Sequence, residues 1–165
     1  MKRRYFLSSA LKTGLVTGGF VLAGTSIAGT SLAETVADAA MTPEITVFRS
    51  PTCGCCGRWS DHLEAAGFRV VDRTTGDMHS VKQQYGIPPR LETCHTASVQ
   101  RYIIEGHVPA EDIKRLLAER PKVAGLVAPG MPIGSPGMED GDEVEPFTVF
   151  TFKHNGSVAV FARHI

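Results

Sequence analysis

Three of the four cysteines of this 165-residue chain lie within four positions, in the segment Cys53-Gly54-Cys55-Cys56. Cys53 and Cys56 have the C-x-x-C spacing of a redox pair, in which one thiol attacks a disulfide and the other resolves it. Cys55 would compete as a disulfide partner, whereas a third thiolate suits a soft metal that takes several sulfur ligands. Two structural disulfides are disfavoured, because the adjacent Cys55 and Cys56 cannot easily serve two separate cross-links. The segment therefore indicates metal binding or thiol–disulfide exchange.

The fourth cysteine, Cys94, is distant in sequence and is followed directly by His95. In a thioredoxin-like fold, the loop that contains Cys94 packs against the C-x-x-C segment, which would bring four sulfurs together. Zinc sites usually take their ligands from two well-separated pairs, and this spacing does not match that pattern. A single Cu(I) ion with four thiolates would leave a strongly negative site, whereas thiolates that bridge several Cu(I) ions would lower that charge. We therefore predict a Cu(I) site that holds more than one ion.

Four further side chains are weaker candidates for metal ligands. His95 adjoins Cys94, and His107 lies between a predicted strand and a predicted helix. Met131 and Met138 lie in a loop rich in Gly and Pro, and thioether sulfur also suits Cu(I). The alternative for His107 is a partly buried turn residue. The alternative for the two methionines is a lid that packs on the domain.

The elements that must position these residues follow from the hydrophobic pattern. The pattern predicts strands, helices and turns in the order β-α-β-α-β-β-α, which is a thioredoxin-like α/β fold. The predicted strands are 45–48, 68–71, 96–99 and 102–105, and the predicted helices are 55–66, 77–85 and 109–119. The cysteine cluster (Cys53, Cys55 and Cys56) would then open the first helix, whose N-terminus should lower the pKa of a thiol.

The C-terminal part adds two predicted features to this fold. Residues 121–146 are dense in Pro, Gly and Met and are predicted to form one long loop. Residues 147–153 and 158–161 read as strands, and the Asn155-Gly156 pair between them is a strong hairpin signal. An additional C-terminal β-hairpin is therefore expected.

The N-terminal residues 1–33 have the features of an export signal. A positive start is followed by a mildly apolar stretch and by the small-x-Ala cleavage site Ser31-Leu32-Ala33. Arg3-Arg4, followed by Phe6-Leu7, resembles a twin-arginine export signal; an ordinary secretory signal is the alternative. The apolar stretch is shorter than the ~20 residues of a membrane span, so no stable span is expected in the mature protein. We predict export to the periplasm.

The remaining chain is predicted to form a polar leader at 34–43 and one domain at 44–165. The whole chain has 17 basic and 17 acidic residues. Loss of residues 1–33 removes four basic residues and no acidic ones, which leaves 13 basic and 17 acidic residues and a net charge of −4. Because no basic stripe is present, nucleic acid is not expected as a partner.

Four segments, in chain order, carry the motifs of a known protein family: Ser50 to Trp59, Thr93-Cys94-His95-Thr96, Glu105 to Ala110, and Gly125 to Met138. They resemble a bacterial family, first catalogued as a domain of unknown function, that includes the periplasmic CopG-type copper resistance proteins. The resemblance spans roughly residues 44–162. It implies a thioredoxin-like fold, copper handling in the periplasm, and copper ligands at Cys53, Cys55, Cys56 and Cys94.

These arguments lead to one main prediction and one alternative. The main prediction is a periplasmic Cu(I)-binding protein of copper resistance, whose partners are copper ions and periplasmic copper-handling proteins. Thiol redox chemistry could be coupled to this binding. The alternative is a thiol–disulfide oxidoreductase that uses Cys53 and Cys56, for which Cys55 and Cys94 would be surplus. The pattern leaves open whether the protein is an enzyme.

Overall fold

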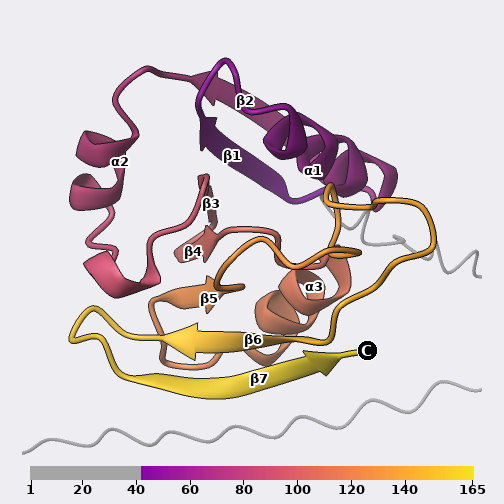
Figure 1. Cartoon of the computed structure of the whole chain (residues 1–165). Helices are drawn as coiled ribbons and strands as arrows, with labels where there is room; N and C mark the ends of the chain where they lie inside the picture. The colour runs from indigo at the N-terminus through magenta and orange to yellow at the C-terminus, as the bar shows by residue number, and fades with distance from the viewer. Residues whose placement is uncertain (1–41) are drawn as a thin grey trace, which may run out of the picture. The chain divides into compact units, whose positions relative to one another are not determined.

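The computed structural model describes residues 42–165 (Figure 1). The predicted signal peptide, its twin-arginine motif and almost all of the predicted leader lie outside the described residues. The elements, in chain order, are β1 (Glu44–Arg49), α1 (Gly54–Ala65), β2 (Arg69–Thr74), α2 (Met78–Gln84), the 3-10 helix η1 (Pro89–Leu91), β3 (Thr96–Val99), β4 (Tyr102–Glu105), α3 (Ala110–Glu119), β5 (Gly125–Val127), β6 (Phe147–Phe152) and β7 (Val158–His164). Within residues 42–165, no helix is both long and apolar enough to cross a membrane.

The strands form one mixed sheet in the order β2-β1-β3-β4-β5-β6-β7. β1 runs parallel to β2 and β4 runs parallel to β5, whereas the other neighbouring strands are antiparallel. In the β1–β3 pair, Phe48 lies opposite Thr96. The end of β1 therefore lies beside the start of β3. This register brings the segment that follows β1 next to the loop that precedes β3.

The predicted element order and the C-terminal hairpin of β6 and β7 are confirmed, and so is the mixed α/β class. The prediction of one uninterrupted loop over 121–146 is wrong, because β5 lies within it and pairs with β4 and β6. β5 has only three residues, which is too short to give a periodic pattern. Gly125 is required there, since a Cβ would lie 1.7 Å from the carbonyl oxygen of Ile103. The narrower thioredoxin-like assignment stays a prediction.

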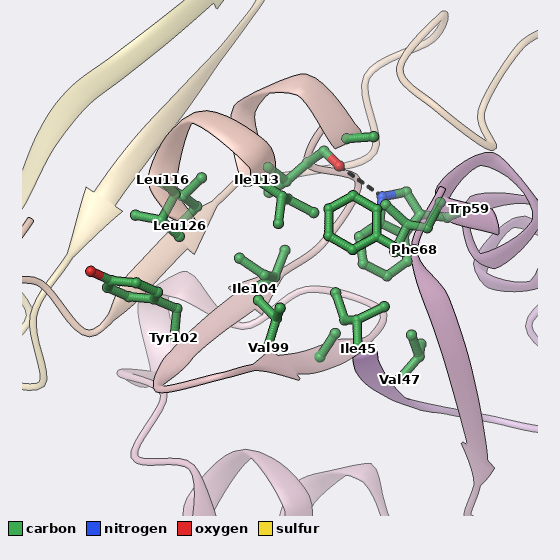
Figure 2. Packing of buried hydrophobic residues seen from close by; sticks show 14 of the residues in the cluster. Ile45, Val47, Trp59, Phe68, Val99, Tyr102, Ile104, Ile113, Leu116 and Leu126 are labelled. Atoms are coloured by element: carbon green, nitrogen blue, oxygen red, sulfur yellow. Dashed lines mark hydrogen bonds between the residues drawn. The ribbon is translucent and has the colours of Figure 1, made fainter. Parts of the chain in front are cut away.

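Successive strand residues point to opposite faces of the sheet, so both faces carry apolar side chains. Helical segments pack on each face and bury these side chains. On one face, α1 and α3 pack on the sheet through the main core, which Figure 2 shows; its largest members include Ile45, Trp59, Leu63, Tyr102, Ile104, Ile113, Leu116 and Leu126. The indole Nε1 of Trp59 donates a 2.9 Å hydrogen bond to the carbonyl oxygen of Val108, which ties α1 to the start of α3 (Figure 2). On the other face, a smaller cluster holds the segment after α2 to β4, β5 and β6: Ile87, Leu91, Ile103, Val127 and Phe152.

Candidate metal centre

The four cysteines meet at the N-terminal end of α1. Cys53 is the N-cap residue of α1, Cys55 and Cys56 lie in its first turn, and Cys94 comes from the loop before β3. Their Sγ atoms all lie within 4.8 Å of one another. The β1–β3 register explains this convergence, because it places the two cysteine-bearing segments side by side. The structure thus brings the four predicted ligands to one site; their role as ligands stays a prediction.

Two of these sulfurs are bonded to each other. Cys53 and Cys56 form a disulfide with a Cα–Cα distance of 5.4 Å, whereas Cys55 and Cys94 are free. The Sγ of Cys55 lies 3.5 Å from the Sγ of Cys53. The structure therefore represents an oxidised state with two free thiols, and reduction would provide four. The alternative with two structural disulfides is not what the structure shows.

The start of α1 presents a positive helix-dipole end to the cysteines. The first turn of the helix contains no acidic residue, so its positive dipole end is not offset locally. The backbone turns tightly into the helix, since the amide of Cys53 donates to the carbonyl of Ser50 at 3.1 Å. The expected lowering of the thiol pKa at this helix end stays a prediction, because Cys53 and Cys56 do not titrate in the disulfide.

Two buried histidines flank Cys94. The side chains of His95 and His107 are fully buried, and the Sγ of Cys94 lies 3.2 Å from Nδ1 of His95 and 3.2 Å from Nε2 of His107. Nδ1 of His107 lies 2.8 Å from the carbonyl oxygen of Pro136. A carbonyl only accepts hydrogen bonds, so Nδ1 of a neutral His107 carries the proton and the lone pair of Nε2 faces Cys94. In this tautomer Nε2 is the ring nitrogen that can bind a metal ion.

A second potential ligand group therefore shares Cys94 with the first. The ligand atoms of Cys94, His95 and His107 also lie within 4.8 Å of one another. Nε2 of His95 is buried without a hydrogen-bond partner among the described residues. The ring nitrogen of His95 that lies 3.2 Å from the Sγ of Cys94 is the other one, Nδ1. The two groups form a continuous set of sulfur and nitrogen donors.

Burial controls the protonation of these side chains. Burial, and then the nearby Cys55, raises the pKa of Cys94 to about 12. Burial, followed by the charges of His107 and Lys82, lowers the pKa of His95 well below its usual value, and burial lowers the pKa of His107. At neutral pH the metal-free site thus holds a protonated Cys94 thiol and two neutral imidazoles. A metal ion that binds Cys94 must displace a proton from it.

The loop between β5 and β6, orange in Figure 1, comes close to α1 and contacts its N-terminal turns. Nε of Arg58 donates to the carbonyl of Gly137 at 3.0 Å. Gly137 has φ +83°, and a Cβ there would lie 2.7 Å from both the carbonyl oxygen of Cys55 and the amide nitrogen of Trp59. Only glycine permits this close approach. The loop therefore lies directly on the helix turn that carries the cysteines.

The structure places the two candidate methionines of this loop differently. Met138 adjoins Gly137 and is half-buried, whereas Met131 is 54% exposed. A lid in which both methionines pack on the domain is therefore wrong for Met131. Met138 lies in the part of the loop that touches α1. A ligand role stays a prediction for both.

Sequence reasoning missed the side chains beneath Cys94. Glu105, at the end of β4, is fully buried and paired with the buried Lys82 of α2. Its carboxylate also accepts hydrogen bonds from Thr93 and Thr96, which flank Cys94-His95. The signal available in the sequence was an acidic residue that closes an otherwise apolar strand and lies two residues before His107.

Comparison with known proteins relates this arrangement to copper. A family model described as "Protein of unknown function, DUF411" matches residues 91–138. Two solved structures of a copper resistance protein CopG are similar. Form 2 has 43% identity and a TM-score of 0.70, covering 74% of this chain and 98% of that chain; form 1 has 44% identity and a TM-score of 0.69, covering 73% and 96%. The chain belongs to the CopG-type copper resistance family. No curated protein matches it.

Membership of the CopG-type family confirms the resemblance predicted from the four sequence segments. The family model includes the Cys94 loop, His107 and the loop over α1, while the Cys53 to Cys56 cluster lies before it. The CopG structures extend the match over almost their whole length. A copper-related function and a cysteine cluster suited to metal binding are therefore supported together.

Proposed function

We propose that the mature chain is a periplasmic Cu(I)-binding protein of copper resistance that binds copper through Cys53, Cys55, Cys56 and Cys94 in their reduced state. The observation that carries the proposal is the convergence of the four Sγ atoms within 4.8 Å in a chain of the CopG-type family. Thiolates select soft metal ions, and Cu(I) is the softest of those that proteins commonly bind.

The donor set favours more than one Cu(I) ion. Four thiolates around one monovalent ion would concentrate negative charge in a half-buried site, which is costly. Bridging thiolates over several Cu(I) ions reduces this charge. The neutral imidazoles of His95 and His107 would extend the sulfur site on the side of Cys94, and Met138 or Met131 would add thioether sulfur from the loop.

The disulfide supports a coupling between copper and thiol redox state. Formation of the Cys53–Cys56 bond removes two electrons and two protons from the pair and leaves only Cys55 and Cys94 as thiols. Oxidation would therefore release Cu(I), and reduction would restore the site. A periplasmic reductant of the dithiol class would be needed, along with copper-handling proteins that deliver or accept the ion.

Export is part of the proposal. The twin-arginine-like Arg3-Arg4 pair and the cleavage site at Ser31-Leu32-Ala33 support delivery to the periplasm. A folded chain exported by this route could carry its metal already bound. Mass spectrometry of the protein recovered from the periplasm tests this cleavage, because a chain cut after residue 33 begins at residue 34.

A thiol–disulfide oxidoreductase is the second candidate, because a C-x-x-C disulfide lies at the N-terminus of a helix that follows a strand. The two functions differ in their need for Cys94. Disulfide exchange by Cys53 and Cys56 would survive the loss of Cys94, whereas tight Cu(I) binding would not.

The experiment is a copper count on the chain from residue 34 onward. The protein is reduced anaerobically, loaded with excess Cu(I) and desalted, and copper per chain is measured beside C94S and the surface control H79A. We expect more than one copper per chain in the unaltered protein and in H79A, and loss of tightly held copper in C94S. One zinc ion per chain in the protein as purified, with no copper retained after Cu(I) loading, would overturn the Cu(I) assignment. No retained copper, with rapid exchange on a disulfide substrate, would favour the oxidoreductase.

A further inference from the structure

A buried carboxylate organises the loop that carries Cys94. Oε1 of Glu105 accepts hydrogen bonds from the amide of Thr93 at 2.6 Å and from the Thr93 hydroxyl at 3.2 Å, and it contacts Nζ of Lys82 at 2.5 Å. Oε2 accepts a 2.6 Å hydrogen bond from the hydroxyl of Thr96. Glu105 is fully buried, and all four of these groups donate to it. Its carboxylate is therefore fully satisfied.

These contacts bracket the two residues that adjoin the sulfur site. Thr93 precedes Cys94, and Thr96 follows His95, so one carboxylate holds both ends of this short segment. The turn is also closed by the amide of Gly106, which donates to the carbonyl of His95 at 3.2 Å. Any displacement of Glu105 would shift the Cys94 loop relative to α1.

The sheet itself does not require this ion pair. Thr96 and Glu105 are backbone partners in the β3–β4 ladder, which holds the strands without their side chains. Lys82 is only 5% exposed, and removing two charges from water is costly. A buried ion pair is often no more stabilising than apolar residues of the same volume. Its contacts with Thr93 and Thr96, which flank Cys94-His95, point to a role in positioning Cys94.

We propose that Glu105 is a positioning residue of the copper site: its carboxylate fixes the Thr93–Thr96 segment so that Cys94 faces the other three sulfurs. Lys82 balances the charge of this carboxylate, so the pair orients Cys94 without adding net charge to the site. This inference rests on the proposed Cu(I) function. Residues that orient metal ligands typically contribute about 10–100-fold to metal affinity.

The test compares variants that separate position from folding. E105Q places an amide among four donors, so at least one of them loses its acceptor, and Lys82 loses its counter-ion. The double variant K82M/E105Q removes both charges and so avoids an unpaired buried lysine. E44Q, at the exposed pair with Arg69, is the matched control. Cu(I) affinity is measured by competition with a chromogenic chelator, and folding by circular dichroism.

We expect the folded double variant to bind Cu(I) about 10–100-fold more weakly, while E44Q binds as the unaltered protein does. Amide hydrogen exchange, measured without metal, should accelerate at Thr93 and its neighbours and remain unchanged in β6 and β7. A purely structural role would change exchange across the whole domain. A folded double variant with unaltered affinity would overturn the proposal.

Failure of the proposed function has a different signature. If the unaltered protein binds no Cu(I), the proposed copper function is wrong. Amide hydrogen exchange then remains as the test of whether Glu105 positions the Cys94 loop. Selective acceleration at Thr93 in K82M/E105Q would support a carboxylate that fixes the Cys94 loop. Unchanged protection there would refute it.

Discussion

Binding of Cu(I) should raise the reduction potential of the Cys53–Cys56 disulfide. The disulfide takes two of the four converging sulfurs out of the donor set and leaves Cys55 and Cys94. If all four thiolates are ligands, Cu(I) binds the reduced protein much more tightly than the oxidised one. By linkage, the ion must then favour reduction.

The size of the shift follows from the linkage relation. For a ligand that binds only one state, free ligand at 100 times its Kd stabilises that state by about 2.7 kcal/mol. For a two-electron couple, about 1.4 kcal/mol corresponds to about 30 mV. The potential should therefore rise by about 60 mV at this copper concentration, and by about 30 mV for each further tenfold increase per bound ion.

The assay is an anaerobic redox titration with free Cu(I) set by a competing chelator. The protein is equilibrated in dithiol buffers of known potential, free thiols are alkylated, and the fraction of disulfide is read by mass spectrometry. The matched control is C55S/C94S, which keeps the C-x-x-C pair but loses the other two sulfurs. Its potential should shift far less at the same free Cu(I).

A specific result would refute this reasoning. If the potential of the unaltered protein stays constant at Cu(I) concentrations that load the reduced chain, Cys53 and Cys56 are not copper ligands. The disulfide would then be a stable cross-link beside a site built on Cys55 and Cys94. Equal shifts in the control would instead assign copper binding to the C-x-x-C pair alone.

Three further predictions concern the surroundings of the site. G137A should destabilise the fold by about 2 kcal/mol or more and speed Cu(I) loss to a chelator, because the added Cβ would lie 2.7 Å from the carbonyl oxygen of Cys55. The control is G130A, which has a similar positive φ but no atom close to the added Cβ. In thermal unfolding, G130A should show only the cost of the backbone strain. Burial lowers the pKa of His95 in the folded protein. The free energy of unfolding should therefore keep its full value above about pH 6.5, the pKa of an unperturbed histidine. Below that pH it should fall by at most about 1.4 kcal/mol per pH unit, because the unfolded chain binds a proton that the folded chain does not. H95Q in the metal-free protein should flatten this slope in denaturant titrations, and an unchanged slope would exclude His95 as its source. W59F should cost about 2–3 kcal/mol in chemical unfolding, because the fully buried indole loses its hydrogen bond and leaves a carbonyl unpaired; a loss below 0.5 kcal/mol would contradict that packing.

Much of the fold was predictable because its signals are local. The strand, turn and helix around the cysteine cluster follow from neighbouring residue types. The Asn155-Gly156 turn gives the hairpin directly. β5 escaped prediction because a three-residue strand has no period, and only its partners β4 and β6 define it.

By itself, the sequence determined that Cys53, Cys55 and Cys56 lie together at the start of one helix, since residues within three positions of each other in a chain cannot be far apart in space. Only the tertiary structure decided that Cys94 joins them, because that contact depends on the β1–β3 register. The disulfide partner, the tautomer and burial of His107, and the Glu105 contacts were likewise decided by packing. Local patterns report which residues face a core. Strand pairing and the packing of helices on the sheet determine which distant residues meet in that core.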